Sequence, residues 1–349
     1  MNRRSLMSGM AVATFLGAGP VLAQPAPANG GPLPSLRMIK SNGINMRIAE
    51  MGTGPLVILV HGWPESWYSW RNQIPVLAAA GYHVVAPDMR GYGKTDKPAA
   101  VEDYDIKHTT ADIVGIIDAM GQQKAIIIGN DWGSIVSWNC MLLYPERFTA
   151  LAAMSVPYGG RGNAAPTVGM RRSYGDNFYY ILYHQEPGVA EKEYDADPRG
   201  LLSRLYTSPD TPLDPPTVTD PKRSAGGWIP RLGKPRALPP WLRQQDLDYY
   251  VSEFTAAGFR GGVNYYRNMD RNWEITPELT GKTIPQPVMF IAGSEDIVIK
   301  GATVDSLTTQ MKRVATDFRG VTLLPGAGHW VQQEQPGAVV DAVLDFLKT

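Results

Sequence analysis

The strongest constraint on the fold of this chain is an alternation of short apolar runs with longer segments of helical periodicity. The apolar runs are rich in Val, Ile and Leu and contain few polar residues, which indicates strands buried on both faces of a sheet. Strands that alternate with helices predict an α/β fold with a mostly parallel central sheet and helices on both faces. We expect strands at residues 56–60, 83–87, 125–128, 151–155, 288–292 and 321–324, and helices at residues 70–80, 108–120, 134–143 and 339–347.

A hairpin is predicted just before the first of these strands. Residues 37–40 and 45–49 flank the pair Asn42-Gly43. A tight hairpin turn needs positive φ at its two central residues, which Asn and Gly tolerate. The first strands should therefore be antiparallel, within a core domain that we expect to comprise residues 36–157 and 276–349.

The alternation stops between residues 158 and 275. This segment contains helix-like aromatic stretches around a proline-rich loop at residues 207–241. Because proline removes a backbone donor and fixes φ, no long regular element is expected in that loop. We expect residues 158–275 to form a helical cap domain over the carboxyl ends of the strands, where open α/β sheets bind ligands.

The N-terminus resembles an export signal of the twin-arginine type. Arg3 and Arg4 precede a weakly apolar run at residues 6–22, which is too short and too interrupted for a membrane span. We expect residues 1–23 to be an export signal and residues 24–35 a flexible linker, which predicts a periplasmic or secreted protein. The alternative is a disordered tail on a cytoplasmic protein.

Composition and charge limit the partners of the chain. Its 349 residues include 33 basic and 33 acidic side chains, so the formal net charge is zero. No basic field is available to attract nucleic acid, and a small, mostly neutral substrate is expected instead. The only cysteine, Cys140, allows neither an intramolecular disulfide nor a cysteine-based metal site. The sequence predicts no particular oligomeric state.

A candidate nucleophile follows the predicted strand at residues 125–128. The strand ends in GNDWG, residues 129–133, and a predicted helix begins directly afterwards. Glycines two places to each side of Asp131 permit the strained strand-to-helix turn, or nucleophile elbow, that raises the central side chain above a sheet. The helix N-terminus favours a charged carboxylate there. A serine esterase is disfavoured because Asp131 itself occupies the centre of the elbow, and Ser134 lies one step into the helix, where an elbow would not place its nucleophile.

An acid and a histidine follow in the chain order expected after a nucleophile. The strand at residues 288–292 is followed by Gly-Ser-Glu-Asp, which offers Glu295 and Asp296, and the last strand is followed by Gly-Ala-Gly-His329. The backbone N–H groups of Trp63 and Trp132 are the expected oxyanion-hole donors.

Four motifs resemble those of the α/β-hydrolase-fold epoxide hydrolases. They are HGWP at residues 61–64, DMRGYG at 88–93, GNDWG at 129–133 and GHW at 328–330, and the match runs from about Arg37 to the C-terminus. The resemblance implies that Asp296, rather than Glu295, orients His329.

The same resemblance extends into the insert. Residues 180–188 and 264–269 are similar to the two lid-tyrosine motifs of the family, which implies that Tyr180 and Tyr266 point at the epoxide oxygen. Tyr183 is the alternative for the first position. His184 departs from the phenylalanine that is usual at its place.

The resemblance implies a two-step reaction that converts an epoxide and water to a vicinal diol. Asp131 would form an ester with the substrate, and a water activated by His329 would hydrolyse it. No metal or organic cofactor is required. The alternative is haloalkane dehalogenation, which uses the same Asp–His–Asp set with Trp132 holding the halide. Members of that class often carry Asn at the position of Trp63 and lack the paired tyrosines.

Overall fold

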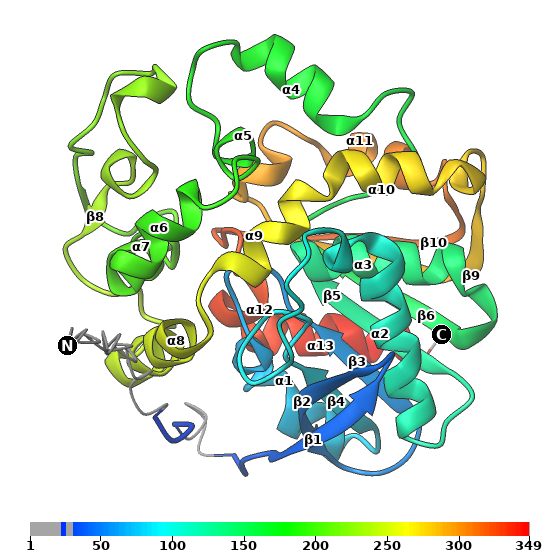
Figure 1. Cartoon of the computed structure of the whole chain (residues 1–349). Helices are drawn as coiled ribbons and strands as arrows, with labels where there is room; N and C mark the ends of the chain where they lie inside the picture. The colour runs from blue at the N-terminus through cyan, green and yellow to red at the C-terminus, as the bar shows by residue number, and fades with distance from the viewer. Residues whose placement is uncertain (1–21, 26–30, 349) are drawn as a thin grey trace, which may run out of the picture.

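A computed structural model describes residues 22–25 and 31–348 of the chain. Its centre is an eight-stranded sheet in the order β1-β2-β4-β3-β5-β6-β9-β10, and β7 and β8 form a separate two-stranded ribbon (Figure 1). The strands are β1 (Ser35–Ser41), β2 (Ile44–Met51), β3 (Leu56–Val60), β4 (His83–Pro87), β5 (Ala125–Asn130), β6 (Phe148–Met154), β7 (Leu213–Asp214), β8 (Lys234–Pro235), β9 (Ile284–Gly293) and β10 (Ala315–Leu324).

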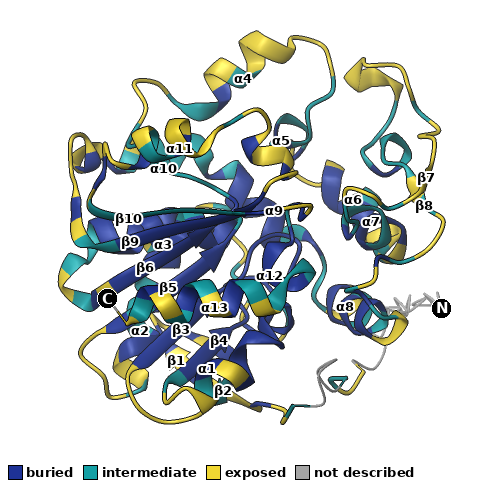
Figure 2. Cartoon of the chain, turned by 180° about the vertical axis from the view of Figure 1, so that it is seen from behind, coloured by how far each residue is buried: buried dark blue, intermediate teal, exposed yellow. Residues whose placement is uncertain are grey.

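Helices cover both faces of the sheet. Helices α2 and α3 pack together on the face turned to the viewer in Figure 1, and α1 and α13 pack together on the other face (Figure 2). The helices are α1 (Gln73–Ala79), α2 (Ile106–Ala119), α3 (Trp132–Leu143), α4 (Pro166–Tyr174), α5 (Tyr180–Tyr183), α6 (Val189–Ala196), α7 (Pro198–Leu205), α8 (Gln244–Ala257), α9 (Arg260–Arg267), α10 (Met269–Ile275), α11 (Val304–Met311), α12 (Val331–Glu334) and α13 (Pro336–Leu347).

The sheet confirms the predicted fold class. From β4 to β10 neighbouring strands are parallel, whereas β1–β2 and β2–β4 are antiparallel. All five residues of β3 are buried, as a strand covered on both faces requires. The predicted hairpin turn is present, with φ of 46° at Asn42 and 79° at Gly43.

Several predicted element bounds differ from the structure. β9 and β10 are each ten residues long, roughly twice the predicted length. The extra residues of β10 include the charged Asp317 and Arg319, so the segment lacks a continuous apolar pattern. Register shifts also interrupt the pairing of β10 with β9. Helix α1 begins at Gln73 rather than at residue 70, because Trp67–Trp70 forms a 3₁₀ turn capped by Ser66.

The insert between β6 and β9 carries helices α4 to α10. These helices lie beside the carboxyl ends of the central strands, and the buried surfaces of α6, α8 and α9 face the rest of the molecule (Figure 2). The proline-rich loop contains only short 3₁₀ turns and the two-residue strands β7 and β8. The proposed boundaries of core and cap stay predictions.

The predicted export signal lies almost entirely outside the described residues, because residues 1–21 are not described. Within residues 22–25 and 31–348, no helix has both the length and the apolar character needed to cross a membrane.

Candidate active site

Asp131 lies at a sharp turn between β5 and α3. Its backbone has φ of 53° and ψ of −121°, a region that non-glycine residues rarely adopt. The turn leaves no space for side chains nearby. A Cβ added at Gly62 would meet the Asp131 side chain at 2.5 Å, and one added at Gly129 or Gly133 would collide with backbone carbonyls. The glycines therefore let neighbouring backbone segments approach the carboxylate closely.

The two carboxylate oxygens of Asp131 have different surroundings. The backbone N–H of Trp63 donates to Oδ1 at 2.7 Å. Oδ2 faces His329, whose Nε2 lies 3.5 Å away. The Asp131 side chain is 13% exposed, so a small molecule can reach it. The structure gives no hydrogen bond from the Trp132 amide to this carboxylate among the described residues, so the role of that amide stays a prediction.

His329 and Asp296 meet where the loops after β9 and β10 lie side by side. The Nδ1 of His329 is 3.0 Å from Oδ1 and 3.1 Å from Oδ2 of Asp296, whose side chain is fully buried. The backbone N–H of Val298 also donates to Asp296, and the Ser155 hydroxyl donates to the His329 carbonyl oxygen. These contacts hold the imidazole between two carboxylates.

Charge and burial act in opposite directions on this pair. Burial disfavours the imidazolium form of His329, but the Asp296 charge and the hydrogen bond to Asp131 outweigh it and raise the pKa of His329 well above its usual value. Burial likewise disfavours the Asp296 carboxylate, but the charge of His329 and the hydrogen bonds lower the pKa of Asp296. The arrangement thus favours an ion pair in the free enzyme.

Tyr180 and Tyr266 come from the insert and face the same cavity as Asp131. Tyr180 begins α5, Tyr266 lies in α9, and their ring centroids are 5.8 Å apart. Burial, followed by the nearby Asp131 charge, raises the pKa of both phenols far above the usual 10. Both hydroxyls therefore keep their protons at neutral pH and can donate them.

The cavity has a volume of about 300 Å³ and aromatic walls. Trp228 stacks on Tyr180 with 4.7 Å between ring centroids and on Trp63 with 5.7 Å. The described residues contain no group of His, Cys, Asp and Glu side chains that could hold a metal ion. The lining residues are Trp63, Pro64, Asp131, Tyr180, Leu205, Thr207, Ser208, Pro209, Trp228, Tyr266, Glu295, Ile297, Val298, Gly328, His329 and Trp330.

Three side chains that the sequence did not favour as catalytic groups make other contacts, namely those of Tyr183, Ser134 and His184. The Tyr183 hydroxyl donates to Glu193, and Ser134 donates to the Val156 carbonyl oxygen. His184 is buried with its ring 4.5 Å from that of Tyr266, and it does not line the cavity. Each of these side chains therefore has a packing or hydrogen-bonding role outside the cavity.

His61 is held by the backbone on both sides of its ring. Nδ1 lies 2.8 Å from the Gly62 carbonyl oxygen, and Nε2 accepts a hydrogen bond from the Met89 N–H. Burial lowers the pKa of His61 to about 4, so it is neutral near pH 7. These contacts give His61 a structural role rather than that of a base.

Sequence reasoning missed Glu65 and Trp228. Glu65 is fully buried and accepts hydrogen bonds from the Gly62 N–H and from the side chains of Gln332 and Gln333. Burial, with the Asp131 charge adding to it, raises the pKa of Glu65 to about 7. The available signal was an acidic residue directly after the HGWP motif. Trp228 lies within the proline-rich loop, whose path no sequence pattern indicated.

The chain is similar to known epoxide hydrolases over most of its length. Residues 55–336 match the family described as alpha/beta hydrolase fold. Epoxide hydrolase A of Mycobacterium tuberculosis is 47% identical over 317 residues, which cover 90% of this chain and 97% of that protein. Epoxide hydrolase 3 of Siraitia grosvenorii is 38% identical, over 88% of this chain and 96% of its own. The crystal structure of epoxide hydrolase A from Mycobacterium thermoresistibile matches with a TM-score of 0.83 and 47% identity, covering 90% of this chain and 98% of that one.

Proposed function

Because the chain belongs to the alpha/beta hydrolase fold family and, within it, to the epoxide hydrolases, we propose that it converts epoxides to vicinal diols through an ester on Asp131. One observation carries this proposal. A single cavity holds a carboxylate on the sheet side and two protonated phenols, Tyr180 and Tyr266, on the side of the insert. An epoxide between them would meet a nucleophile at carbon and proton donors at oxygen.

In the first step Asp131 attacks a ring carbon of the epoxide. Oδ2 is the proposed nucleophilic atom, because Oδ1 already accepts the Trp63 N–H. The carbon–oxygen bond of the ring breaks and its electron pair stays on the epoxide oxygen, which takes a proton from Tyr180 or Tyr266. Donors placed where negative charge develops lower the barrier, since they stabilise the transition state more than the ground state. The product is an alkyl ester of Asp131.

Ester formation changes the proton affinity of His329. The Asp131 charge and its hydrogen bond are among the causes that raise the pKa of His329. Esterification removes that charge, so the pKa of His329 should fall and its proton can pass to the tyrosinate that the first step leaves. His329 is then able to act as a base in the second step, while Asp296 continues to orient it.

In the second step a water molecule gives a proton to Nε2 of His329 and attacks the ester carbonyl carbon. The oxyanion forms on Oδ1, where the Trp63 N–H can stabilise it. The bond between the carbonyl carbon and Oδ2 then breaks, and Oδ2 takes the remaining proton of the water and leaves as the second hydroxyl of the diol. The water oxygen stays in the regenerated carboxylate. No step requires a metal or an organic cofactor, and the partners are a small epoxide and water.

A substrate panel tests the proposed function. Purified protein should produce diols from styrene-type or aliphatic epoxides and should release no halide from haloalkanes. The reaction of an epoxide differs from that of a haloalkane in its need for two proton donors, which this cavity supplies. Halide release without diol formation would instead support the dehalogenase alternative.

The variant His329→Gln tests the two-step scheme. It should still form the ester but hydrolyse it more slowly by about 10⁴-fold, because the general base is lost. Mass spectrometry of the peptide that contains Asp131 should then show an added mass equal to that of the epoxide. An unmodified peptide after exposure to a substrate that wild-type protein consumes would contradict the scheme.

A further inference from the structure

Glu193 connects α6 to the proline-rich loop, which runs beside that helix (Figure 1). Its Oε2 accepts the backbone N–H of Trp228 at 2.9 Å, and its Oε1 accepts that of Ile229 at 3.0 Å. The Tyr183 hydroxyl also donates to Oε2, at 2.9 Å. Both oxygens of one carboxylate therefore hold two consecutive residues of a loop that contains only short 3₁₀ turns and two-residue strands.

Gly227 allows the Glu193 carboxylate to approach the loop this closely. A Cβ added at Gly227 would lie 2.2 Å from Oε1 and 2.5 Å from Oε2 of Glu193. The φ of Gly227 is not positive, so glycine is needed here for the close contact and not for the backbone conformation. The contact between helix and loop thus depends on a carboxylate on one side and on the absence of a side chain on the other.

Trp228 connects this contact to the catalytic cavity, which its side chain lines. The indole stacks on Tyr180 with 4.7 Å between ring centroids and 17° between the ring planes. It also stacks on Trp63, with 5.7 Å and 11°. Trp63 in turn supplies the backbone N–H that donates to Asp131. The residue that Glu193 holds therefore contacts both a proton donor and the residue that binds the nucleophile.

Ring packing sets the direction of the Tyr180 hydroxyl. No hydrogen-bond partner of this hydroxyl is found among the described residues, and Tyr180 begins a helix of only four residues. Tyr179, His184 and Tyr266 meet its ring edge to face, whereas Trp228 lies flat against it. The flat contact limits how far the phenol ring can tilt. The position of the hydroxyl therefore depends on the position of the indole.

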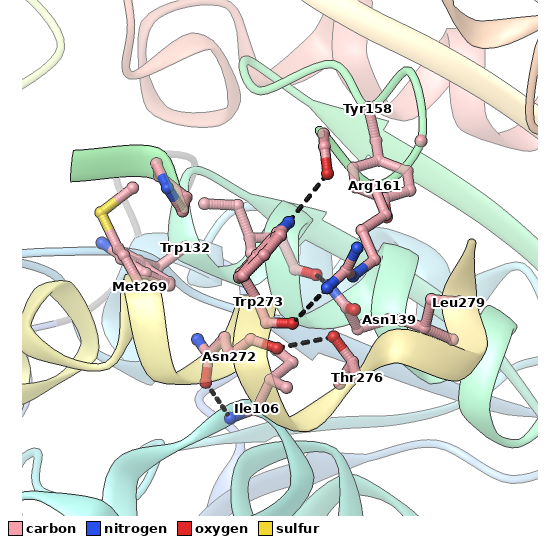
Figure 3. Close-up of a pocket in the computed structure, with 14 residues that line it drawn as sticks. Ile106, Trp132, Asn139, Tyr158, Arg161, Met269, Asn272, Trp273, Thr276 and Leu279 are labelled. Atoms are coloured by element: carbon pink, nitrogen blue, oxygen red, sulfur yellow. Dashed lines mark hydrogen bonds between the residues drawn. The ribbon is translucent and has the colours of Figure 1, made fainter. Parts of the chain in front are cut away.

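The cavity between α3 and α10, whose lining residues Figure 3 shows, is a separate space. Neither Trp228 nor Tyr180 lines it, and no described residue lines both cavities. Loosening the proline-rich loop at Trp228 should therefore change the catalytic cavity and leave the other one as it is.

We propose that Glu193 is a positioning residue for Tyr180. The carboxylate fixes the backbone at Trp228, the indole holds the phenol ring, and the hydroxyl stays where the epoxide oxygen takes its proton. Glu193 does not line the cavity, so it acts through Trp228 alone. The proposal rests on the proposed function, in which Tyr180 is a proton donor. A displacement of about 1 Å at a reacting group can cost roughly 10²-fold in rate, so a modest release of the loop should be measurable.

Glu193→Gln tests the proposal in single-turnover measurements of ester formation and of ester hydrolysis. The amide keeps the size of the side chain but has an oxygen at only one of the two positions, so one loop N–H must face an N–H₂ group. Ester formation should slow by at least about tenfold, which is less than the roughly 10²–10³-fold expected for a lost donor. Ester hydrolysis should keep the wild-type rate, because no proton of Tyr180 is used in that step.

Two further variants separate positioning from a general loss of structure. In a Tyr180→Phe background, Glu193→Gln should cause little additional loss, since no hydroxyl remains to be misplaced. Asp248→Asn is the matched control. It removes another carboxylate of the insert, which accepts hydrogen bonds from Arg199 and Gln244, and neither of these partners lines the cavity. Both rates should stay at the wild-type value in this control.

Hydrogen exchange at the amides of Trp228 and Ile229 provides a measurement that needs no catalysis. Exchange should be faster in Glu193→Gln than in wild type and unchanged in Asp248→Asn. Wild-type ester formation in Glu193→Gln, an equal loss with and without the Tyr180 hydroxyl, or unchanged exchange overturns the proposal. Absence of ester and diol with wild-type protein contradicts the proposed function, whereas exchange still upholds or overturns the hold of Glu193 on the loop.

Discussion

The two sides of the catalytic cavity are built in different ways. On the sheet side, Asp131 directly follows β5 and His329 lies in the loop after β10, and backbone crowding at glycines fixes the position of the nucleophile. On the side of the insert, Tyr180 and Tyr266 are placed by the packing of aromatic rings against Trp63, Trp228 and each other. The sheet side depends on glycines at which an added Cβ would collide with neighbouring atoms, whereas the insert side depends on contacts between aromatic side chains.

This difference predicts how each side responds to substitution. A backbone-determined site should fail when a single methyl group is added at a crowded glycine. A packing-determined site should keep its shape when one hydroxyl is removed from a ring that stays in place, so the loss then reports the chemistry of that hydroxyl. Substitutions on the two sides therefore separate positioning from proton donation.

The largest effect is expected when both phenol hydroxyls are removed. Tyr180→Phe combined with Tyr266→Phe should slow ester formation by about 10⁴-fold or more, since each lost donor costs about 10²–10³-fold. The rings and their packing remain. Single-turnover measurement of ester formation checks the effect, and an unchanged rate would refute the role proposed for both residues.

Tyr265→Phe is the matched control for the phenol variants. Tyr265 is adjacent to Tyr266 and packs against Trp132, but its hydroxyl donates to the Arg90 carbonyl oxygen and it does not line the cavity. Its substitution should lower stability slightly and leave the rate of ester formation unchanged. A loss as large as that of Tyr266→Phe would mean that the rate reports packing rather than proton donation.

A smaller but still large effect is expected from Gly62→Ala on the sheet side. The added methyl group would meet the Cβ and Oδ1 of Asp131 at 2.5 Å, so the carboxylate must move. A displacement of about 1 Å can cost roughly 10²-fold in rate. Gly337→Ala is the control, since a Cβ there meets nothing within 4 Å and the position has no positive φ. If both variants have wild-type kcat/KM, backbone crowding does not position the nucleophile.

The smallest effect concerns Glu65, which connects the two loops behind Asp131. Its folded-state pKa of about 7 is raised above the usual 4.5 mainly by burial. The folded state therefore holds this proton more tightly than the unfolded state, and the associated stability is lost as pH rises from about 4.5 through about 7. Glu65→Gln cannot ionise and should lack this loss.

Thermal unfolding across this pH range measures the effect of Glu65→Gln. The new amide can donate to the Gln332 side-chain oxygen after a flip, since that oxygen has no partner, whereas Gln333 loses an acceptor, so the test rests on the pH dependence of Tm and not on its absolute value. As pH rises from about 4.5 to above 7, the Tm of wild type should fall relative to that of the variant by about 1–2 °C, which corresponds to roughly 1 kcal/mol for a chain of this length. Parallel pH profiles of Tm would show that Glu65 is ionised throughout.

The sequence predicted the sheet side better than the insert side for physical reasons. A strained turn such as that at Asp131 requires glycines at fixed spacing, so the geometry leaves a readable pattern. Packing of aromatic rings leaves no such pattern, and Tyr180 and Tyr266 could be selected among many tyrosines only through a family resemblance. The place of Trp228 in the cavity could not be predicted at all, because it depends on how the irregular proline-rich loop packs in space.

The central claim is that the substrate becomes covalently attached to Asp131. A single turnover in water enriched in ¹⁸O tests it most directly, with enzyme in excess over epoxide and mass spectrometry of both the diol and the peptide that contains Asp131. Our account predicts that the heavy oxygen enters the Asp131 carboxylate while the diol stays unlabelled. Heavy oxygen in the diol, with none in the peptide, would mean that water attacks the epoxide directly and would contradict the account.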